Sequence, residues 1–372
     1  MTSPQMPLLL TPGPLTTSEQ TRAALGRDWG SREADFIALS EGVRARLAAL
    51  AGVAGTHVAV PVQGSGTFAV EAAVQTLVPR DGKLLVLING AYGRRILEIA
   101  RRLDRACVTL EVPEDQAIPP DSVARALAAD AAITDVALVH CETTSGLLNP
   151  LGDIAAVVQD AGRRLSLDAM SSFGAVPIDG AAMRFTALIG SSNKGLEGVP
   201  GLSFVLAETA HLARCEANAS SLSLDLFAQW RGFEANGQWR FTPPVQVVAA
   251  LSAALDQLDA EGGITARHVR YRRNCELLVA GMAAHGFQPY IEPRLQAPVI
   301  VTFAMPPGNW FHFQQFYDFL HAHGIVIYPG KLTALPSFRI GCIGAIGAND
   351  MRRALAGVDA FMAARGAAQS AA

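Results

Sequence analysis

Apolar runs of strand length alternate with helix-length amphipathic segments through more than half of this sequence. This alternation is typical of an α/β domain with a mostly parallel sheet. Seven strands are expected, at residues 57–62, 83–88, 107–112, 135–140, 165–168, 187–191 and 202–206. Helices are expected between them, at residues 67–77, 93–103, 121–129 and 153–161. We therefore predict a large domain in which helices flank a mostly parallel seven-stranded sheet.

The pattern changes after residue 244, where two long helical stretches follow, 245–261 and a second one that ends near 284. Shorter elements come next, with strands expected at 299–303, 326–328 and 337–340 and helices at 313–323 and 349–362. This mixture predicts a smaller α+β C-terminal domain. We expect the large domain to span 17–255, the small domain 256–365 and a disordered tail 366–372.

Charge and cysteine content exclude several classes of protein. The 372 residues carry 30 basic and 33 acidic side chains, and a net charge of -3 gives no general attraction to nucleic acid or an anionic membrane. The five cysteines are odd in number and form no CxxC pair, so neither a disulfide framework nor a metal site is indicated. No apolar stretch approaches the roughly 20 residues that a membrane-spanning helix needs. We expect a cytoplasmic protein that binds any anionic ligand through local groups.

A glycine-rich turn, Gln63-Gly64-Ser65-Gly66-Thr67, joins a predicted strand to a predicted helix. Backbone N–H groups and hydroxyls at a helix N-terminus are suited to binding a phosphate. The turn lacks the third glycine of a dinucleotide-binding motif and the Gly-Lys-Ser/Thr of a triphosphate-binding loop. From these residues alone, a phosphate site and a simple tight connection both stay open.

Two more candidate residues follow predicted strands. Asp168 ends the run Leu165-Ser166-Leu167, which places a carboxylate at the sheet edge where α/β proteins bind ligands. A helix-capping or turn aspartate is the alternative interpretation. Lys194 lies among small polar residues in Ser192-Asn193-Lys194-Gly195. In a pocket its pKa would fall and its amine would form a Schiff base, whereas the alternative is a solvated surface lysine.

These three features match the requirements of pyridoxal 5'-phosphate. The cofactor's phosphate needs a binding site, its ring nitrogen needs a carboxylate, and its aldehyde needs a lysine amine. The glycine-rich turn, Asp168 and Lys194 supply one candidate for each. The sequence therefore predicts an enzyme that uses this cofactor.

A set of short segments also carries a family resemblance: Leu10-Thr11-Pro12-Gly13-Pro14-Leu15-Thr16, Gln63-Gly64-Ser65-Gly66-Thr67, Asn89-Gly90-Ala91-Tyr92-Gly93, Cys141-Glu142-Thr143-Thr144, Asp168-Ala169-Met170-Ser171-Ser172-Phe173-Gly174, Asn193-Lys194, Gly198-Val199-Pro200-Gly201, Trp239-Arg240-Phe241-Thr242 and Tyr328-Pro329-Gly330-Lys331. In these segments the chain resembles the 2-aminoethylphosphonate:pyruvate aminotransferases, which are class V, fold-type I pyridoxal phosphate enzymes. The resemblance runs from Leu8 to about Ala360. It implies that segment 1–16 contributes to the entrance of the active site.

The resemblance also implies a role for each matching residue. Lys194 would bind the cofactor covalently, Asp168 would pair with the ring nitrogen, and Tyr92 would stack on the ring. The other implied cofactor contacts are Ser65, Gly66 and Thr67 at the phosphate, Asn193 at the phosphate end, Thr143 at the 3-oxygen, and Thr242 from the partner subunit of a homodimer. Arg339 and Gly13 are the implied substrate-binding residues, with a guanidinium suited to an acidic group. Without the family, the alternative interpretation of Arg339 is a strand arginine in a surface ion pair.

The implied activity transfers the amino group of 2-aminoethylphosphonate to pyruvate, giving phosphonoacetaldehyde and alanine. The chain departs from the family pattern at Val245-Gln246, where a threonine-histidine pair is usual, and at Gly195, where a cysteine is common. Other class V aminotransferases, of alanine:glyoxylate or serine:pyruvate type, and a phosphonate lyase on the same scaffold stay open as alternatives. A non-catalytic carrier of the cofactor is a further alternative, but it would not need Arg339. Cys342 suggests a cysteine desulfurase, but this chain lacks the cysteine loop of that family.

Overall fold

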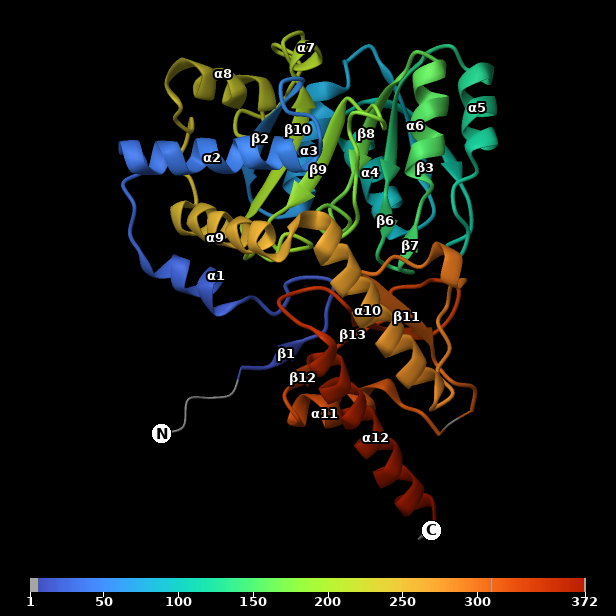
Figure 1. The fold of residues 1–372 in the computed structure, drawn as a ribbon. Coiled ribbons are helices and arrows are strands. Elements are labelled where there is room, and N and C mark those ends of the chain that lie inside the picture. The colour runs from blue at the N-terminus through green and yellow to red at the C-terminus, as the bar shows by residue number, and fades with distance from the viewer. Residues whose placement is uncertain (1–5, 309, 371–372) are drawn as a thin grey trace.

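The computed structural model describes residues 6–308 and 310–370 of the chain. Its main sheet has seven strands in the order β2-β10-β9-β8-β5-β3-β4 (Figure 1). The strands are β2 (His57–Gln63), β3 (Lys83–Ile88), β4 (Ala106–Glu111), β5 (Ile133–Val139), β8 (Arg164–Asp168), β9 (Ala187–Ser191) and β10 (Leu202–Glu208). All run in one direction except β10, which is antiparallel to both neighbours. The predicted mostly parallel seven-stranded sheet is confirmed.

Helices bury both faces of this sheet, which explains why its strands are almost continuously apolar. Along β3, Leu84 and Val86 pack into the core on one face, while Leu85 and Leu87 pack into the core on the other. The face of Leu84 is covered by α3 (Gly66–Leu77), α4 (Ala91–Arg102), α7 (Thr209–Leu212) and α8 (Leu226–Asn236). The face of Leu85 is covered by α2 (Ala34–Leu50), α5 (Pro120–Ala129), α6 (Leu151–Asp160) and α9 (Val245–Glu261).

A second, three-stranded sheet forms the centre of a C-terminal domain. Its antiparallel strands are β11 (Ile300–Ala304), β14 (Ser337–Gly341) and β13 (Tyr328–Pro329). The other elements there are α10 (Gly263–Ala283), η2 (Pro293–Leu295), α11 (Phe313–Ala322) and α12 (Ala348–Ser370). The backbone of α12 includes 366–370, part of the segment for which the sequence predicts a disordered tail, and 371–372 lie outside the described residues.

The strand predicted at 326–328 is wrong as a single element. Its beginning belongs to β12 (Ile325–Val326), which pairs in parallel with β1 (Leu8–Leu9), whereas its end belongs to β13, which pairs with β14. A run of apolar residues does not show that its two halves pair with different partners. Because β1 is part of this arrangement, Leu8 and Leu10 pack into the core of the C-terminal domain, and β1 lies beside β12 (Figure 1). Helices α1 (Glu19–Ala23) and η1 (Ala24–Gly26) then lead to the large domain.

The two domains meet at the edge where the parallel strands of the main sheet end. The hairpin of β6 (Cys141–Glu142) and β7 (Leu147–Leu148) follows β5 at this edge. From the C-terminal domain, Thr302 donates a hydrogen bond to the carbonyl of Thr144, and Arg339 donates one to the carbonyl of Thr143. Loops that follow several parallel strands therefore open toward the second domain, which is where α/β proteins bind ligands.

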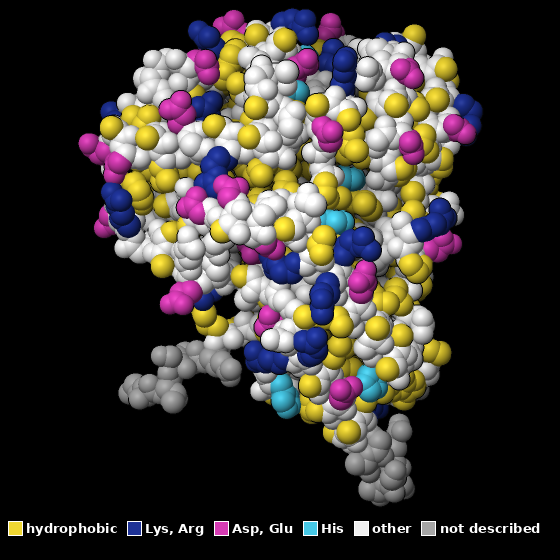
Figure 2. All heavy atoms as spheres, in the orientation of Figure 1, with side chains coloured by type: hydrophobic (Ala, Val, Ile, Leu, Met, Phe, Trp, Pro, Cys, Tyr) yellow, Lys and Arg dark blue, Asp and Glu magenta, His cyan; other side chains and the backbone are white. Residues whose placement is uncertain are grey.

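The surface shows no large region of a single charge on the face drawn in Figure 2, where basic and acidic side chains are interspersed over the large domain. Within the described residues, no helix combines the length and apolar character that crossing a bilayer requires. The same part of the chain holds no group of three or more His, Cys, Asp or Glu side chains placed to bind a metal ion.

Candidate active site

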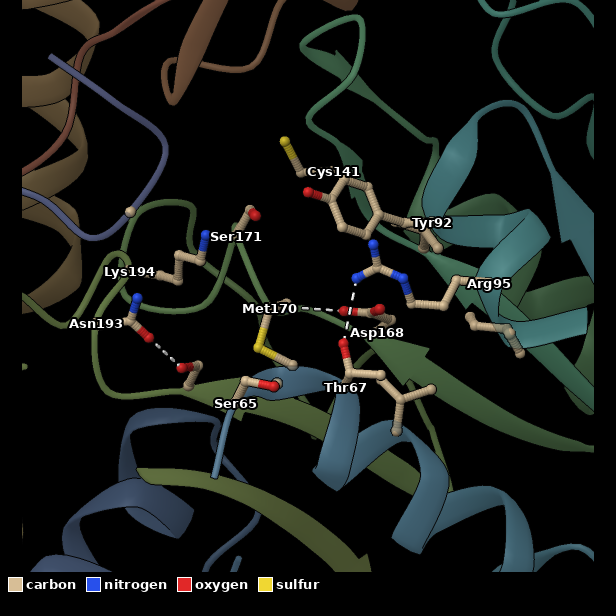
Figure 3. Close-up of a pocket in the computed structure, with 16 residues that line it drawn as sticks. Ser65, Thr67, Tyr92, Arg95, Cys141, Asp168, Met170, Ser171, Asn193 and Lys194 are labelled. Carbon is tan, nitrogen blue, oxygen red and sulfur yellow. Dashed lines mark hydrogen bonds between the residues drawn. The ribbon is translucent and has the colours of Figure 1, made fainter. Parts of the chain in front are cut away.

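A cavity of about 230 Å³ lies where the parallel strands of the main sheet end. Predicted site residues form much of its lining: Gly13, Ser65, Gly66, Thr67, Tyr92, Asp168, Asn193 and Lys194 (Figure 3). They come from the N-terminal segment, the starts of α3 and α4, the end of β8 and the loop after β9. The topology thus brings together residues that are widely separated in sequence.

The glycine-rich turn presents free hydroxyls at the start of α3. Ser65 is the N-cap residue of this helix, yet its side chain caps none of the helix N–H groups in the described chain. Thr67 accepts a hydrogen bond from Nη1 of Arg95 at 3.2 Å. A Cβ atom on Gly66 would come within 2.4 Å of the sulfur of Met170, so the flexible end of that side chain would have to move. The turn therefore offers hydroxyls and a helix N-terminus to an anion in the cavity.

Asp168 places a buried carboxylate in the cavity wall. It is the last residue of β8, is 6% exposed, and accepts a hydrogen bond from the backbone N–H of Met170 at 2.9 Å. Burial raises its pKa to about 6, while that hydrogen bond and the charges of Arg95 and Lys194 act in the opposite direction. A cationic partner in the cavity would favour the ionised form of this carboxylate.

Lys194 is held in the turn between β9 and β10. Its Nζ atom donates a hydrogen bond to the carbonyl oxygen of Pro12 at 2.7 Å. Gly13 also lies against it, because a Cβ atom there would come within 2.7 Å of the Lys194 Cδ atom. Burial lowers the pKa of Lys194 to about 8, helped by the charge of Arg339 and opposed by Asp168. About a tenth of such an amine is neutral at about pH 7.

Tyr92 and Arg95 lie on one face of α4, next to Asp168. The guanidinium carbon of Arg95 is 4.9 Å from the centre of the Tyr92 ring, and both side chains line the cavity (Figure 3). Arg95 is absent from the sequence predictions. Its spacing of three residues from Tyr92 on a predicted helix is the signal that places it on the same face.

Thr143 and Arg339 lie outside the cavity lining but contact each other beside it. Nη1 of Arg339 donates to the Thr143 carbonyl at 3.0 Å, and its Nε donates to the Pro329 carbonyl at 3.1 Å. Arg339 is 2% exposed, and this burial lowers its pKa. Its acceptors are neutral carbonyls, which differs from the exposed ion pair of the alternative interpretation. A buried guanidinium without a hydrogen-bonded carboxylate is suited to receiving an anion.

Thr242 is not brought into the cavity of its own chain. It is exposed in the loop before α9 and lines a neighbouring hollow together with Gln63, Gly64 and Phe68. The two hollows share the glycine-rich turn, since residues 63–64 line one and residues 65–67 line the other. Thr242 therefore lies on the outer side of the turn, where the surface includes the half-exposed ring of Phe68.

Known proteins match this chain over almost its whole length. The family model for class V aminotransferases matches residues 15–348. A protein of Burkholderia lata named 2-aminoethylphosphonate–pyruvate transaminase 2 is 52% identical, over 98% of this chain and 97% of its own. A 2-aminoethylphosphonate–pyruvate transaminase of Pseudomonas putida is 54% identical, over 94% of this chain and 95% of its own.

Among solved structures, pyridoxamine–pyruvate aminotransferase from Mesorhizobium loti has a TM-score of 0.89 and 26% identity, covering 98% of this chain and 94% of that one. Its similarity includes the main sheet and the C-terminal domain that meet at the cavity. The family model extends across both of these domains, and the two named relatives are identical to this chain at more than half of the aligned positions. The chain therefore belongs to the class V aminotransferase family.

Proposed function

We propose that this protein is a pyridoxal phosphate-dependent transaminase that transfers the amino group of 2-aminoethylphosphonate to pyruvate, giving phosphonoacetaldehyde and alanine. The relatives that are 52% and 54% identical carry this activity in their names. The observation that carries the proposal is Arg339, a buried guanidinium whose hydrogen-bond acceptors are neutral carbonyls and whose charge lowers the pKa of Lys194. A reactive amine beside a cation suits a substrate with an amino group at one end and an acidic group at the other.

The residues around the cavity fit pyridoxal 5'-phosphate. Ser65, Gly66 and Thr67 would bind the phosphate, supported by Asn193. Asp168 would pair with the ring nitrogen, Tyr92 would contact the ring face, and Thr143 would hydrogen-bond the 3-oxygen. When bound, the group supplies an aldehyde carbon that accepts amino groups and a ring that stores an electron pair. The uncapped hydroxyl of Ser65 and the buried carboxylate of Asp168 are the features of this chain that support the fit.

Lys194 would hold the cofactor and then act as the proton carrier. Because burial lowers its pKa to about 8, a neutral amine is available near neutral pH. This Nζ atom would move a proton from the carbon that bears the donor's amino group to the cofactor's aldehyde carbon, and in the second half it would move a proton from that carbon to the carbon of the acceptor. The ionised carboxylate of Asp168 would stabilise a proton on the ring nitrogen.

Arg339 would bind the acidic group in both halves of the reaction. The first half brings a phosphonate and the second brings the carboxylate of pyruvate, and a planar guanidinium pairs with either through two parallel hydrogen bonds. Its Nη1 and Nε already donate to the carbonyls of Thr143 and Pro329, which fixes the plane of the group. The same residue thereby orients both substrates toward Lys194.

The active unit in this proposal is a homodimer. Thr242 is exposed beside the glycine-rich turn. Phe68 and Phe241 line the same hollow as Thr242, and each is 49% exposed. Burying such apolar surface against a second copy is favourable. In this arrangement Thr242 would extend toward the phosphate site of the partner subunit.

Separate additions of amino donors to the purified holoenzyme test the activity. With 2-aminoethylphosphonate, the absorbance band of the bound cofactor should decline, and pyruvate should restore it with one alanine formed per phosphonoacetaldehyde. Faster reaction of serine with pyruvate, or of alanine with glyoxylate, would assign another class V activity. Release of inorganic phosphate without alanine would indicate a lyase. A spectrum that changes with amine but never turns over would indicate a carrier.

A further inference from the structure

A buried ionic cluster joins the turn that carries Lys194 to the C-terminal domain. We call it the Glu197 cluster, and its members are Glu197, Glu261, Arg267, Arg270 and Tyr271. Glu197 accepts hydrogen bonds from Nη2 of Arg270 at 2.7 Å and from the hydroxyl of Tyr271. Glu261 accepts from Nε of Arg267 at 2.8 Å and from Nε of Arg270 at 2.7 Å. Glu197 is 5% exposed and Arg267 is 1% exposed, so the centre of the cluster is shielded from water.

The cluster also contacts the backbone of the turn that carries Lys194. The N–H of Glu197 donates to the carbonyl of Lys194 at 2.9 Å, and Nη1 of Arg267 donates to the carbonyl of Gly195 at 3.2 Å. Glu197 has a φ of 62°, in the left-handed region that disfavours residues with a side chain. A glutamate keeps this conformation only where its surroundings hold it.

The other end of the cluster reaches into the C-terminal domain. Arg270 and Tyr271 belong to α10, and Nη1 of Arg270 donates to the carbonyls of Gly344 and Ile346 at 2.7 Å each. None of these side chains is among those that line the cavity. Burying the Glu197 carboxylate and the Arg267 guanidinium is costly unless both charges are paired, and the partly exposed Arg270 and Glu261 supply the partners. Because apolar packing would avoid this desolvation cost, we infer that the charged groups beside Lys194 have a specific role there.

We propose that Glu197 is a positioning residue for Lys194: its carboxylate, held by Arg270 and Tyr271 of the C-terminal domain, keeps the turn in the conformation that buries the lysine amine in the cavity. The inference rests on the proposed function in taking Lys194 as the reactive residue. If the turn relaxes, the amine becomes more hydrated and its pKa rises from about 8 toward the ordinary 10.5. The titratable groups that act on this amine are Arg339, Asp168, Lys331 and Cys141, and none of them is changed by a substitution at position 197.

The test measures the amine directly in the full-length apoprotein. The chain has three lysines, Lys83, Lys194 and Lys331, so peptides labelled by acetic anhydride can be assigned individually by mass spectrometry. Labelling rates measured from about pH 6 to pH 10 give the pKa of each amine. We expect Glu197→Gln to raise the pKa of Lys194 by at least one unit and to leave the profile of Lys331 unchanged. In the holoenzyme the same variant should lower kcat at least about tenfold with little change in KM.

Glu261→Gln is the matched control, because Glu261 pairs with the same two arginines but does not contact the Lys194 turn. Its Lys194 profile should match that of the unchanged protein. An unshifted profile in Glu197→Gln, or equal shifts in both variants, would overturn the proposal. If Glu197→Gln does not fold, Tyr271→Phe removes one donor to Glu197 and should shift the pKa in the same direction, and no shift there would overturn it too. A shift in a protein that fails to transaminate 2-aminoethylphosphonate supports the positioning role and contradicts the proposed function alone.

Discussion

The Nζ atom of Lys194 lies 2.7 Å from the carbonyl oxygen of Pro12, a residue 182 positions earlier in the chain. This hydrogen bond joins the N-terminal segment to the lysine that we propose as the reactive residue. The amine is therefore enclosed by a carbonyl on one side and by its own buried turn on the other. That enclosure explains the lowered pKa of Lys194, to which desolvation contributes most.

Replacing Lys194 by alanine should abolish transamination, because no other amine lines the cavity in the described chain. Reduction of the unchanged holoenzyme with borohydride should leave the cofactor attached to the peptide that contains Lys194. Lys83→Arg is the control, since Lys83 pairs with Asp130 away from the cavity and should remain active. Attachment to Lys83 or Lys331 would show that the assignment of Lys194 is wrong.

Asp168→Asn should reduce turnover far more than cofactor binding. In the proposed function the carboxylate would stabilise positive charge on the ring nitrogen, while the glycine-rich turn would supply a separate phosphate contact. Loss of about 3 kcal/mol of transition-state stabilisation corresponds to about a hundredfold decrease in kcat. Steady-state kinetics and cofactor titration measure the two effects separately. Near-normal turnover would contradict the role given to Asp168.

The stability of the apoprotein should depend on pH through Asp168. Its folded pKa of about 6 lies above the ordinary 3.8, so its contribution to stability is present below pH 3.8 and is lost as pH rises through 6. Relative to Asp168→Asn, the unchanged apoprotein should lose about 2 kcal/mol of unfolding free energy between about pH 4 and pH 7. Urea unfolding of both proteins at several pH values checks this. A difference that stays constant with pH would rule out the raised pKa.

Thr242 should act in the site of the partner subunit. If so, subunits with Lys194→Ala and subunits with Thr242→Ala should form mixed dimers in which one of the two sites has both residues intact. Activity should then recover after the two inactive proteins are mixed and exchange subunits. Light scattering and labelled subunits confirm that exchange has occurred. Absence of recovery after exchange would mean that Thr242 serves its own chain.

Arg339→Lys should raise the KM for 2-aminoethylphosphonate while leaving the cofactor spectrum unchanged. Lysine keeps the charge but loses the planar pair of donors, and a charge-assisted contact of this kind contributes about 1.5 to 3 kcal/mol, or about 10- to 100-fold in affinity. The KM for pyruvate should rise as well, because the same residue receives its carboxylate. Unchanged KM values for both substrates would place the acidic group elsewhere in the site.

The sequence predicts best what one stretch of residues determines alone. The expected strands at 83–88 and 187–191 coincide with β3 and β9, because each is a short apolar run bounded by polar residues. Helix α2 is absent from the predictions, since apolar residues such as Ile37 and Leu39 lie outside its buried face, and no clear apolar stripe stands out in its alanine-rich sequence. The formation of a helix such as α2 is determined by its tertiary contacts.

The same limit applies to the site. Lys194 and Asp168 are predicted as site residues from their chemical types and their places at or after strand ends, and the structure places both side chains in the lining of the cavity. Arg95 and Glu197 are missed because their significance depends on partners far away in the chain, such as Arg270 for Glu197. A single sequence does not show which distant charges meet.

The pairing of β1 with β12 also determines when the site is completed during synthesis. All seven strands of the main sheet have been made once Glu208 has been added, so the large domain can collapse while translation continues. The β1 strand, although it leaves the ribosome first, has no partner until Ile325 and Val326 emerge. Pro12 and Gly13 follow directly after β1 and reach their places over Lys194 only then. The lysine amine is thus enclosed only after Ile325 and Val326 have emerged, and a nascent chain that stops before them would have the strands of the main sheet but an open, hydrated lysine.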